Sequence, residues 1–156
     1  MKKTKYITIG LATITFLSSC GQVDYAKNNL IKPEDFFNQS QNLYGVYYFS
    51  ESCPMCVDTL PYIETYLNKL SKQENLYNKL ENIYFIDAMV TPIERYTESE
   101  DRNAFLYTQI GITDYNDLLQ IGYPLLYIVQ NVNEVKTIQD IKIGRKAIID
   151  YITTIW

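Results

Sequence analysis

Two cysteines, Cys53 and Cys56, lie three positions apart in the stretch "ESCPMCVDTLP", directly after a run of aromatic residues. Two thiols at this spacing can bind a metal ion, close a structural disulfide, or exchange electrons as a dithiol–disulfide couple. A structural zinc site needs four ligands, yet the chain contains no histidine and only one further cysteine. We therefore expect neither a metal nor any other cofactor at this pair.

Redox exchange explains the spacing better than a permanent disulfide does. A bond between Cys53 and Cys56 would close a very small loop, which removes little entropy from the unfolded chain. Pro54 suits the first turn of a helix, so Cys53 should lie at a helix N-terminus, where free N–H groups and the helix dipole stabilise a thiolate. We therefore predict that Cys53 is the nucleophile, that Cys56 resolves the mixed disulfide, and that Met55 contacts substrate.

The third cysteine, Cys20, ends an N-terminal segment with three parts. A basic stretch with three lysines precedes an uncharged apolar run, and "LSSC" closes the run. The run is short for a membrane span, and the whole segment resembles the signal peptide and lipobox of bacterial lipoproteins. The resemblance implies cleavage before Cys20 and attachment of a fatty-acyl (palmitate) anchor. It predicts a signal peptide at 1–19, a lipidated tether at 20–32 and a folded domain at 33–156.

The charge of the processed chain bears on its location and partners. Removal of residues 1–19 leaves 11 basic and 18 acidic side chains, a net charge of −7. An anionic membrane surface repels such a chain, so the lipid must hold it at the extracytoplasmic face of the cell membrane. Disulfides are stable on that side, and lipidation of Cys20 leaves Cys53 and Cys56 as each other's partners. The chain has no basic stripe, so we expect no nucleic-acid partner.

Hydrophobic periodicity predicts the elements that position the cysteines. A buried strand is expected over Leu43–Phe49, and the apolar spacing after Cys53 predicts a helix to about Ser71. A strand–helix–strand unit followed by a hairpin and a last helix predicts a mixed sheet with helices on both faces. The remaining expected elements are strands at 83–90, 125–129 and 134–143, a helix start at Pro33, helical pieces within 91–120 and a final helix at 145–156.

Several features follow one another along the chain: "CPMC" after a strand, Pro61 in the next helix, Asp87 ending a second strand, Tyr123-Pro124, and Gly144 before the last helix. Their order resembles the thioredoxin-like superfamily. The resemblance covers about 43–156, and it implies a three-layer α/β fold with a helical insertion before the strand that follows a cis-proline. It also implies thiol–disulfide oxidoreductase activity on protein or peptide cysteines, a membrane redox partner, and a cis Pro124 whose neighbour Tyr123 offers its backbone to an extended substrate.

Three departures from the superfamily leave the direction of electron flow open. Ser52 stands where thioredoxins have Trp, Tyr47 where they have a buried acid, and Met55 where strong oxidants have His. The layout also loosely resembles the bacteriocin transport accessory proteins of Gram-positive bacteria. That likeness implies an alternative, an accessory or binding lipoprotein for peptide export with little redox turnover. A second alternative is a structural surface lipoprotein in which the cysteine pair stays oxidised.

Overall fold

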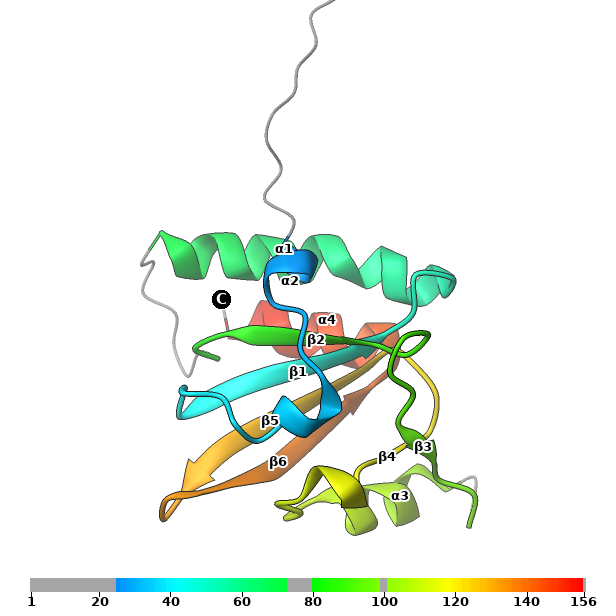
Figure 1. The fold of residues 1–156 in the computed structure, drawn as a ribbon. Helices are drawn as coiled ribbons and strands as arrows, with labels where there is room; N and C mark the ends of the chain where they lie inside the picture. The colour runs from blue at the N-terminus through cyan, green and yellow to red at the C-terminus, as the bar shows by residue number, and fades with distance from the viewer. Residues whose placement is uncertain (1–24, 73–79, 99–100, 156) are drawn as a thin grey trace, which may run out of the picture.

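The computed structural model describes residues 25–72, 80–98 and 101–155, which form a mixed four-stranded sheet with the strand order β2-β1-β5-β6 (Figure 1). Strands β1 and β2 are parallel, and the β1–β5 and β5–β6 pairs are antiparallel. The mixed α/β class expected from the sequence is therefore confirmed. The strands are β1 (Leu43–Phe49), β2 (Ile83–Asp87), β5 (Leu125–Val132) and β6 (Val135–Ile143).

Helices cover the two faces of this sheet differently. Helices α2 (Pro54–Ser71) and α4 (Gly144–Thr154) lie together over one face (Figure 1). Helix α3 (Arg102–Gln109) supplies Phe105 to the core on the other face, and Phe36, which directly follows the 3₁₀ turn η1 (Pro33–Asp35), is buried in the same core. Each core is dominated by aliphatic and aromatic residues, so burial of apolar surface is the main force that holds the layers together.

Strand β1 lies between the two cores and leads to the cysteines. All of its residues after Leu43 except Gly45 are large and apolar, and all are buried. Its side chains alternate, so that Tyr47 faces α2 while Tyr44 and Tyr48 face the opposite core. Gly45 permits close packing, because a Cβ atom there would lie 2.9 Å from Cδ1 of Leu126. A strand buried on both faces is a rigid support for the loop that follows it.

The segment before β5 is only partly helical. Helix α3 begins after Asp101, whose carboxylate caps the N–H of Asn103, and Gly111 follows it with φ +89°. This helix and the 3₁₀ turn η2 (Tyr115–Asp117), which follows Asp114, are the helical pieces expected within 91–120. The sequence did not predict the parallel pair β3 (Glu94–Arg95) and β4 (Leu119–Gln120), because two-residue strands carry too little periodicity to detect.

Residues 25–32, which the sequence places in the tether, belong to the ordered structure. They include the short helix α1 (Tyr25–Asn28). Leu30 then bridges to Phe85: the N–H of Ile31 donates to the Phe85 carbonyl at 2.9 Å, and the Phe85 N–H donates to the Asn29 carbonyl at 2.9 Å. The segment thus lies along the outer edge of β2 (Figure 1).

Two expected elements are shorter in the structure. The helix expected at Pro33 is only η1, because the side chains of Asn38 and Gln39 donate to carbonyls in that turn. Strand β2 ends at Asp87 instead of continuing to residue 90, because the Asp87 carboxylate accepts the Met89 N–H and turns the chain.

The expected signal peptide lies outside the described residues. Among the described helices, none is long and apolar enough to cross a membrane.

Candidate active site

The cysteine pair lies at one end of the sheet, after the last residue of β1. Three loop residues connect Phe49 to Cys53, and α2 begins directly afterwards at Pro54. Because β5 is antiparallel to β1, with Tyr48 opposite Leu125, the Tyr123-Pro124 pair that precedes β5 lies at this same end. The topology therefore gathers the cysteines and the expected substrate-binding residues at one edge of the molecule.

Cys53 occupies the N-cap position of α2, where its sulfur replaces the oxygen acceptor of an ordinary cap. Its backbone is extended, with φ −94° and ψ 112°, and its Sγ accepts the N–H of Cys56 at 3.3 Å. Pro54 follows at the first helical position, where it has no N–H to leave unpaired. Cys53 keeps 7% of its surface exposed, so its sulfur lies at the margin of the core.

Cys56 lies behind Cys53 and is fully buried, and both cysteines are free thiols. Burial, followed by the hydrogen bond with the Cys53 side chain, raises the pKa of the Cys56 thiol to about 12. A backbone hydrogen bond from Ser50 and the hydroxyl of Tyr47 oppose this shift in part. Cys56 is therefore a neutral thiol at physiological pH, with two donors already placed for its thiolate.

Tyr47 connects β1 to the resolving cysteine. Its hydroxyl donates to the carbonyl of Cys56 at 3.1 Å, and its ring stacks on Phe49 at a centroid distance of 5.7 Å. Burial raises the pKa of Tyr47, so the hydroxyl stays protonated and continues to donate. Sequence reasoning treated Tyr47 only as the replacement of a buried acid. The alternation of β1, which turns Tyr47 toward α2, is the signal that could have identified it.

Ser50 and Ser52 shape the loop between β1 and Cys53. Ser50 is fully buried, its hydroxyl lies 2.8 Å from that of Ser52, and its carbonyl accepts the N–H of Cys53 at 3.1 Å. These hydrogen bonds hold the chain in one conformation as it turns from strand to helix. Ser50 was not among the residues predicted from the sequence, since nothing in its local pattern distinguishes it from a solvated loop serine.

Of the three residues expected to contact substrate, Tyr123 and Met55 are exposed and Pro124 is buried. The Tyr123-Pro124 bond is cis, as predicted, and Tyr123 is 40% exposed with its ring against that of Tyr48. Within the described residues, the backbone N–H and carbonyl of Tyr123 form no hydrogen bond. Met55, between the cysteines, is 52% exposed. Cys20, the expected lipidation site, lies outside the described residues.

A Tyr47→Phe substitution is expected to slow the reaction of Cys56, because the Tyr47 hydroxyl opposes the rise in the pKa of that thiol. It should also lower the free energy of unfolding. It removes a buried donor from the Cys56 carbonyl, which should cost about 1 kcal/mol of unfolding free energy. Tyr44→Phe is the matched control, because Tyr44 is equally buried on β1 but donates to the Phe36 carbonyl in the opposite core. Denaturant titration should show similar losses, whereas thiol-exchange kinetics should change only for Tyr47→Phe. Equal kinetics in both variants would contradict this role of Tyr47.

The chemistry of this site rests on two thiols and the polar groups around them. In residues 25–72, 80–98 and 101–155, no group of three or more His, Cys, Asp or Glu side chains is placed to hold a metal ion. The arrangement suits attack by one sulfur and resolution by the other.

No protein-family model and no curated protein sequence matches this chain.

Proposed function

We propose that this protein is a thiol–disulfide oxidoreductase with a thioredoxin-like fold, anchored by lipid at the extracytoplasmic face of the cell membrane. The observation that carries the proposal is the N-capping sulfur of Cys53, which accepts the Cys56 N–H at 3.3 Å while Cys56 lies buried behind it. Cys53 keeps 7% of its surface exposed and Cys56 keeps none, so the first thiol is the one that a client disulfide can reach in a dithiol exchange reaction.

The proposed thioredoxin-like fold is supported by the order and direction of the strands. The strand before the cysteines is central, the next strand is parallel to it, and the last two form an antiparallel hairpin on its other side. The helix that begins after Cys53 and the C-terminal helix share one face of the sheet. The cis Pro124 precedes the third strand of this order.

In the first step, the Cys53 thiolate attacks one sulfur of a client disulfide. A bond forms between Cys53 Sγ and that sulfur, the client S–S bond breaks, and the second client sulfur leaves as a thiolate that takes up a proton. The N–H of Cys56 points at the attacking sulfur, and the peptide dipoles of α2 add to its effect at the helix N-terminus. These groups stabilise the negative charge before the attack.

In the second step, Cys56 loses its proton to solvent and attacks Cys53 Sγ. The Cys53–Cys56 disulfide forms, the mixed disulfide breaks, and the client leaves as a second thiolate. The client gains two electrons and the cysteine pair loses two, and the same steps in reverse oxidise a client dithiol. A membrane dithiol–disulfide partner restores the pair. The Tyr47 hydroxyl and the Ser50 backbone stabilise the Cys56 thiolate while it forms.

The backbone of Tyr123 positions the client beside Cys53. Its N–H and carbonyl form no hydrogen bond within the described structure, and they lie at the sheet end that holds the cysteines. An extended client segment can therefore pair with Tyr123 as a short added strand. Met55 and Val57 present exposed apolar surface on the first turns of α2 for the side chains of that segment.

The lipid anchor has its own test. Cys20→Ala removes the thiol that would carry the lipid, so the variant is expected to leave the membrane fraction or to keep residues 1–19 uncleaved. Fractionation followed by intact-mass measurement distinguishes these results. Cys53→Ala is the control, because it removes a thiol that carries no lipid and should keep the membrane location. Normal cleavage and membrane retention of Cys20→Ala would contradict the anchor.

A second candidate function is an accessory lipoprotein that binds an exported peptide with little redox turnover. It is favoured by the exposed apolar side chains Met89 (68%) and Val90 (70%), which follow β2 at the same end of the sheet as the cysteines. The experiment that separates the two functions is disulfide trapping with single serine variants, because only the oxidoreductase accumulates an adduct on Cys53. A double variant that keeps full biological activity would favour the accessory function.

A further inference from the structure

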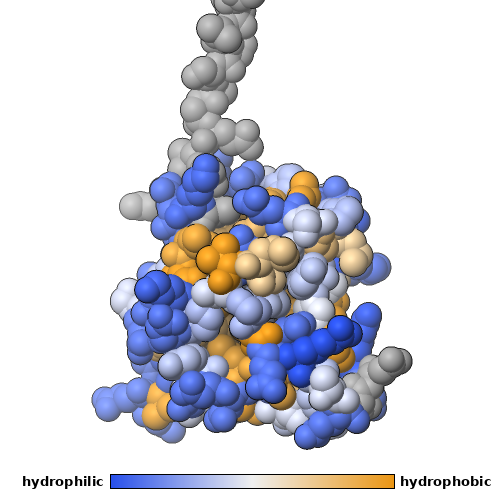
Figure 2. Space-filling model, turned by 45° about the vertical axis from the view of Figure 1, so that its right-hand side comes forward, coloured by the Kyte–Doolittle hydropathy of each residue, from blue (hydrophilic) through white to orange (hydrophobic). Residues whose placement is uncertain are grey.

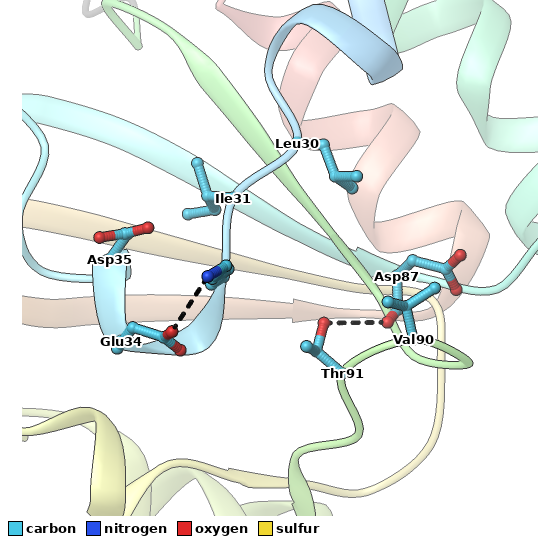
Figure 3. Close-up of a pocket in the computed structure, with 8 residues that line it drawn as sticks. Leu30, Ile31, Glu34, Asp35, Asp87, Val90 and Thr91 are labelled. Atoms are coloured by element: carbon cyan, nitrogen blue, oxygen red, sulfur yellow. Dashed lines mark hydrogen bonds and ion pairs between the residues drawn. The ribbon is translucent and has the colours of Figure 1, made fainter.

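Two adjoining hollows extend from the cysteine loop along the outer edge of β2. The larger has a volume of about 660 Å³ and lies between residues 30–35 and residues 87–91 (Figure 3). The smaller has a volume of about 190 Å³ and is lined in part by Phe49 and Glu51, which flank the turn toward Cys53. Leu30 and Asp87 line both hollows, so we treat the two as one groove, called the acidic groove.

The lining of the acidic groove combines negative charge with apolar surface. One carboxylate oxygen of Asp87 accepts the Met89 N–H at 2.9 Å. Lys32 Nζ lies 3.9 Å from Glu34 Oε1, so these two opposite charges offset each other. Leu30 is 52% exposed and Val90 is 70% exposed, and Figure 2 shows apolar surface bordered by hydrophilic surface on this side. Carboxylates outnumber lysines: they are Glu34, Asp35, Glu51, Glu64 and Asp87 against Lys27 and Lys32.

The spacing of these carboxylates distinguishes a peptide from a metal ion. Among the described residues, no three of the acidic, cysteine or histidine side chains converge as ion ligands. Charges distributed along a groove instead match several cationic side chains on an extended chain, with apolar residues between them. An anionic membrane surface would be repelled by the same carboxylates.

We propose that the acidic groove binds the segment of a client polypeptide that flanks its reactive cysteine, and that this segment is rich in lysine or arginine and in apolar residues. The inference rests on the proposed oxidoreductase function, which defines the client as a polypeptide with a reactive cysteine. The groove begins close to the attacking thiol, because Glu51, which lines one end of it, lies two residues before Cys53 in the chain. The groove thereby selects which cysteines reach Cys53, on the side of the loop away from β5.

The test measures binding without thiol chemistry. Three fluorescent peptides are titrated with the full chain in nonionic detergent micelles. Each carries serine in place of cysteine, and the serine is flanked by leucine together with lysine, glutamine or glutamate. Fluorescence anisotropy, corrected for micelles alone, is expected to rank the lysine peptide tightest and the glutamate peptide weakest. Higher salt should weaken binding of the lysine peptide, because salt screens partly exposed charges. Equal affinity for all three peptides would overturn the proposal.

Matched charge variants locate the binding. The double variant Glu51→Gln with Asp87→Asn keeps side-chain shape and an acceptor for the Met89 N–H. It should weaken binding of the lysine peptide about fivefold, the range for partly exposed charge pairs. Glu134→Gln with Asp150→Asn is the control: Glu134 lies at the opposite end of the sheet and Asp150 on α4. This control changes the net charge equally and should leave affinity within about twofold. Equal weakening in both double variants would show general charge attraction and overturn the groove.

Failure of the redox function gives a separate result. The same peptides with cysteine restored, as mixed disulfides with a chromophoric thiol, report exchange at Cys53. Charge-selective binding of the serine peptides without any release of the chromophore would refute the oxidoreductase and leave the groove as a binding surface. Release of the chromophore at equal rates from all the peptides, together with equal affinities, would refute the groove and leave the oxidoreductase.

Discussion

Replacement of Cys56 with serine is expected to convert the protein into a trap for its clients. Cys53 should still attack a client disulfide, because its N-cap position does not depend on the second sulfur. The mixed disulfide should then persist, since serine has no thiolate with which to attack Cys53 Sγ. Non-reducing electrophoresis of the cell envelope should show adducts that disappear on reduction, and mass spectrometry should place them on Cys53.

The Cys53→Ser variant is the matched control for this trap. It keeps one thiol and nearly the same side-chain volume, but the remaining Cys56 is fully buried and a neutral thiol at physiological pH. We expect no adducts with this variant and none with the double serine variant. Equal trapping by both single variants would contradict the assignment of Cys53 as nucleophile, and the absence of trapping by Cys56→Ser would contradict the exchange mechanism.

Release of a client from Cys53 is expected to accelerate strongly with pH. Burial is the first cause that raises the pKa of the Cys56 thiol to about 12, and burial persists when Cys53 carries a client. The thiol is therefore protonated throughout the neutral range, and its thiolate fraction increases as the pH rises toward that pKa. The release rate should increase roughly tenfold per pH unit between about pH 6 and pH 9.

The measurement is stopped-flow release of a fluorescent thiol from a mixed disulfide formed beforehand on Cys53. The Cys56→Ser variant supplies the background, because any release from it is hydrolysis or exchange with solvent thiols. A rate that reaches a plateau near neutral pH in the wild type would show that Cys56 is already a thiolate there. That result would contradict the protonated, buried resolving thiol.

Local patterns predicted the elements around the site well. The apolar run over β1 predicted the observed bounds, Leu43–Phe49, because its tyrosines, Val46 and Phe49 are residue types that favour a buried strand. The helix after Cys53 was also predicted to within a residue at each end, since Pro54 marks its start and apolar spacing continues to Ser71. The cis Tyr123-Pro124 bond is confirmed as well.

Tertiary contacts account for what sequence reasoning missed. The bridge between Leu30 and Phe85 joins segments far apart in the chain, so no local period announces that residues 25–32 add to the sheet edge. The hydrogen bond from Tyr47 to the Cys56 carbonyl depends on how α2 lies over β1. The acidic groove also requires this folding, because its carboxylates come from segments that are separate in the sequence.

The redox equilibrium of the Cys53–Cys56 pair shows directly whether the two thiols exchange electrons as a couple. The full chain in detergent is equilibrated with mixtures of reduced and oxidised glutathione, quenched by alkylation and analysed by peptide mass spectrometry. We expect one reversible two-electron transition between dithiol and disulfide that involves both cysteines, and the midpoint gives the direction of electron flow against the glutathione couple. A pair that stays oxidised or stays reduced across all mixtures would contradict the exchange mechanism.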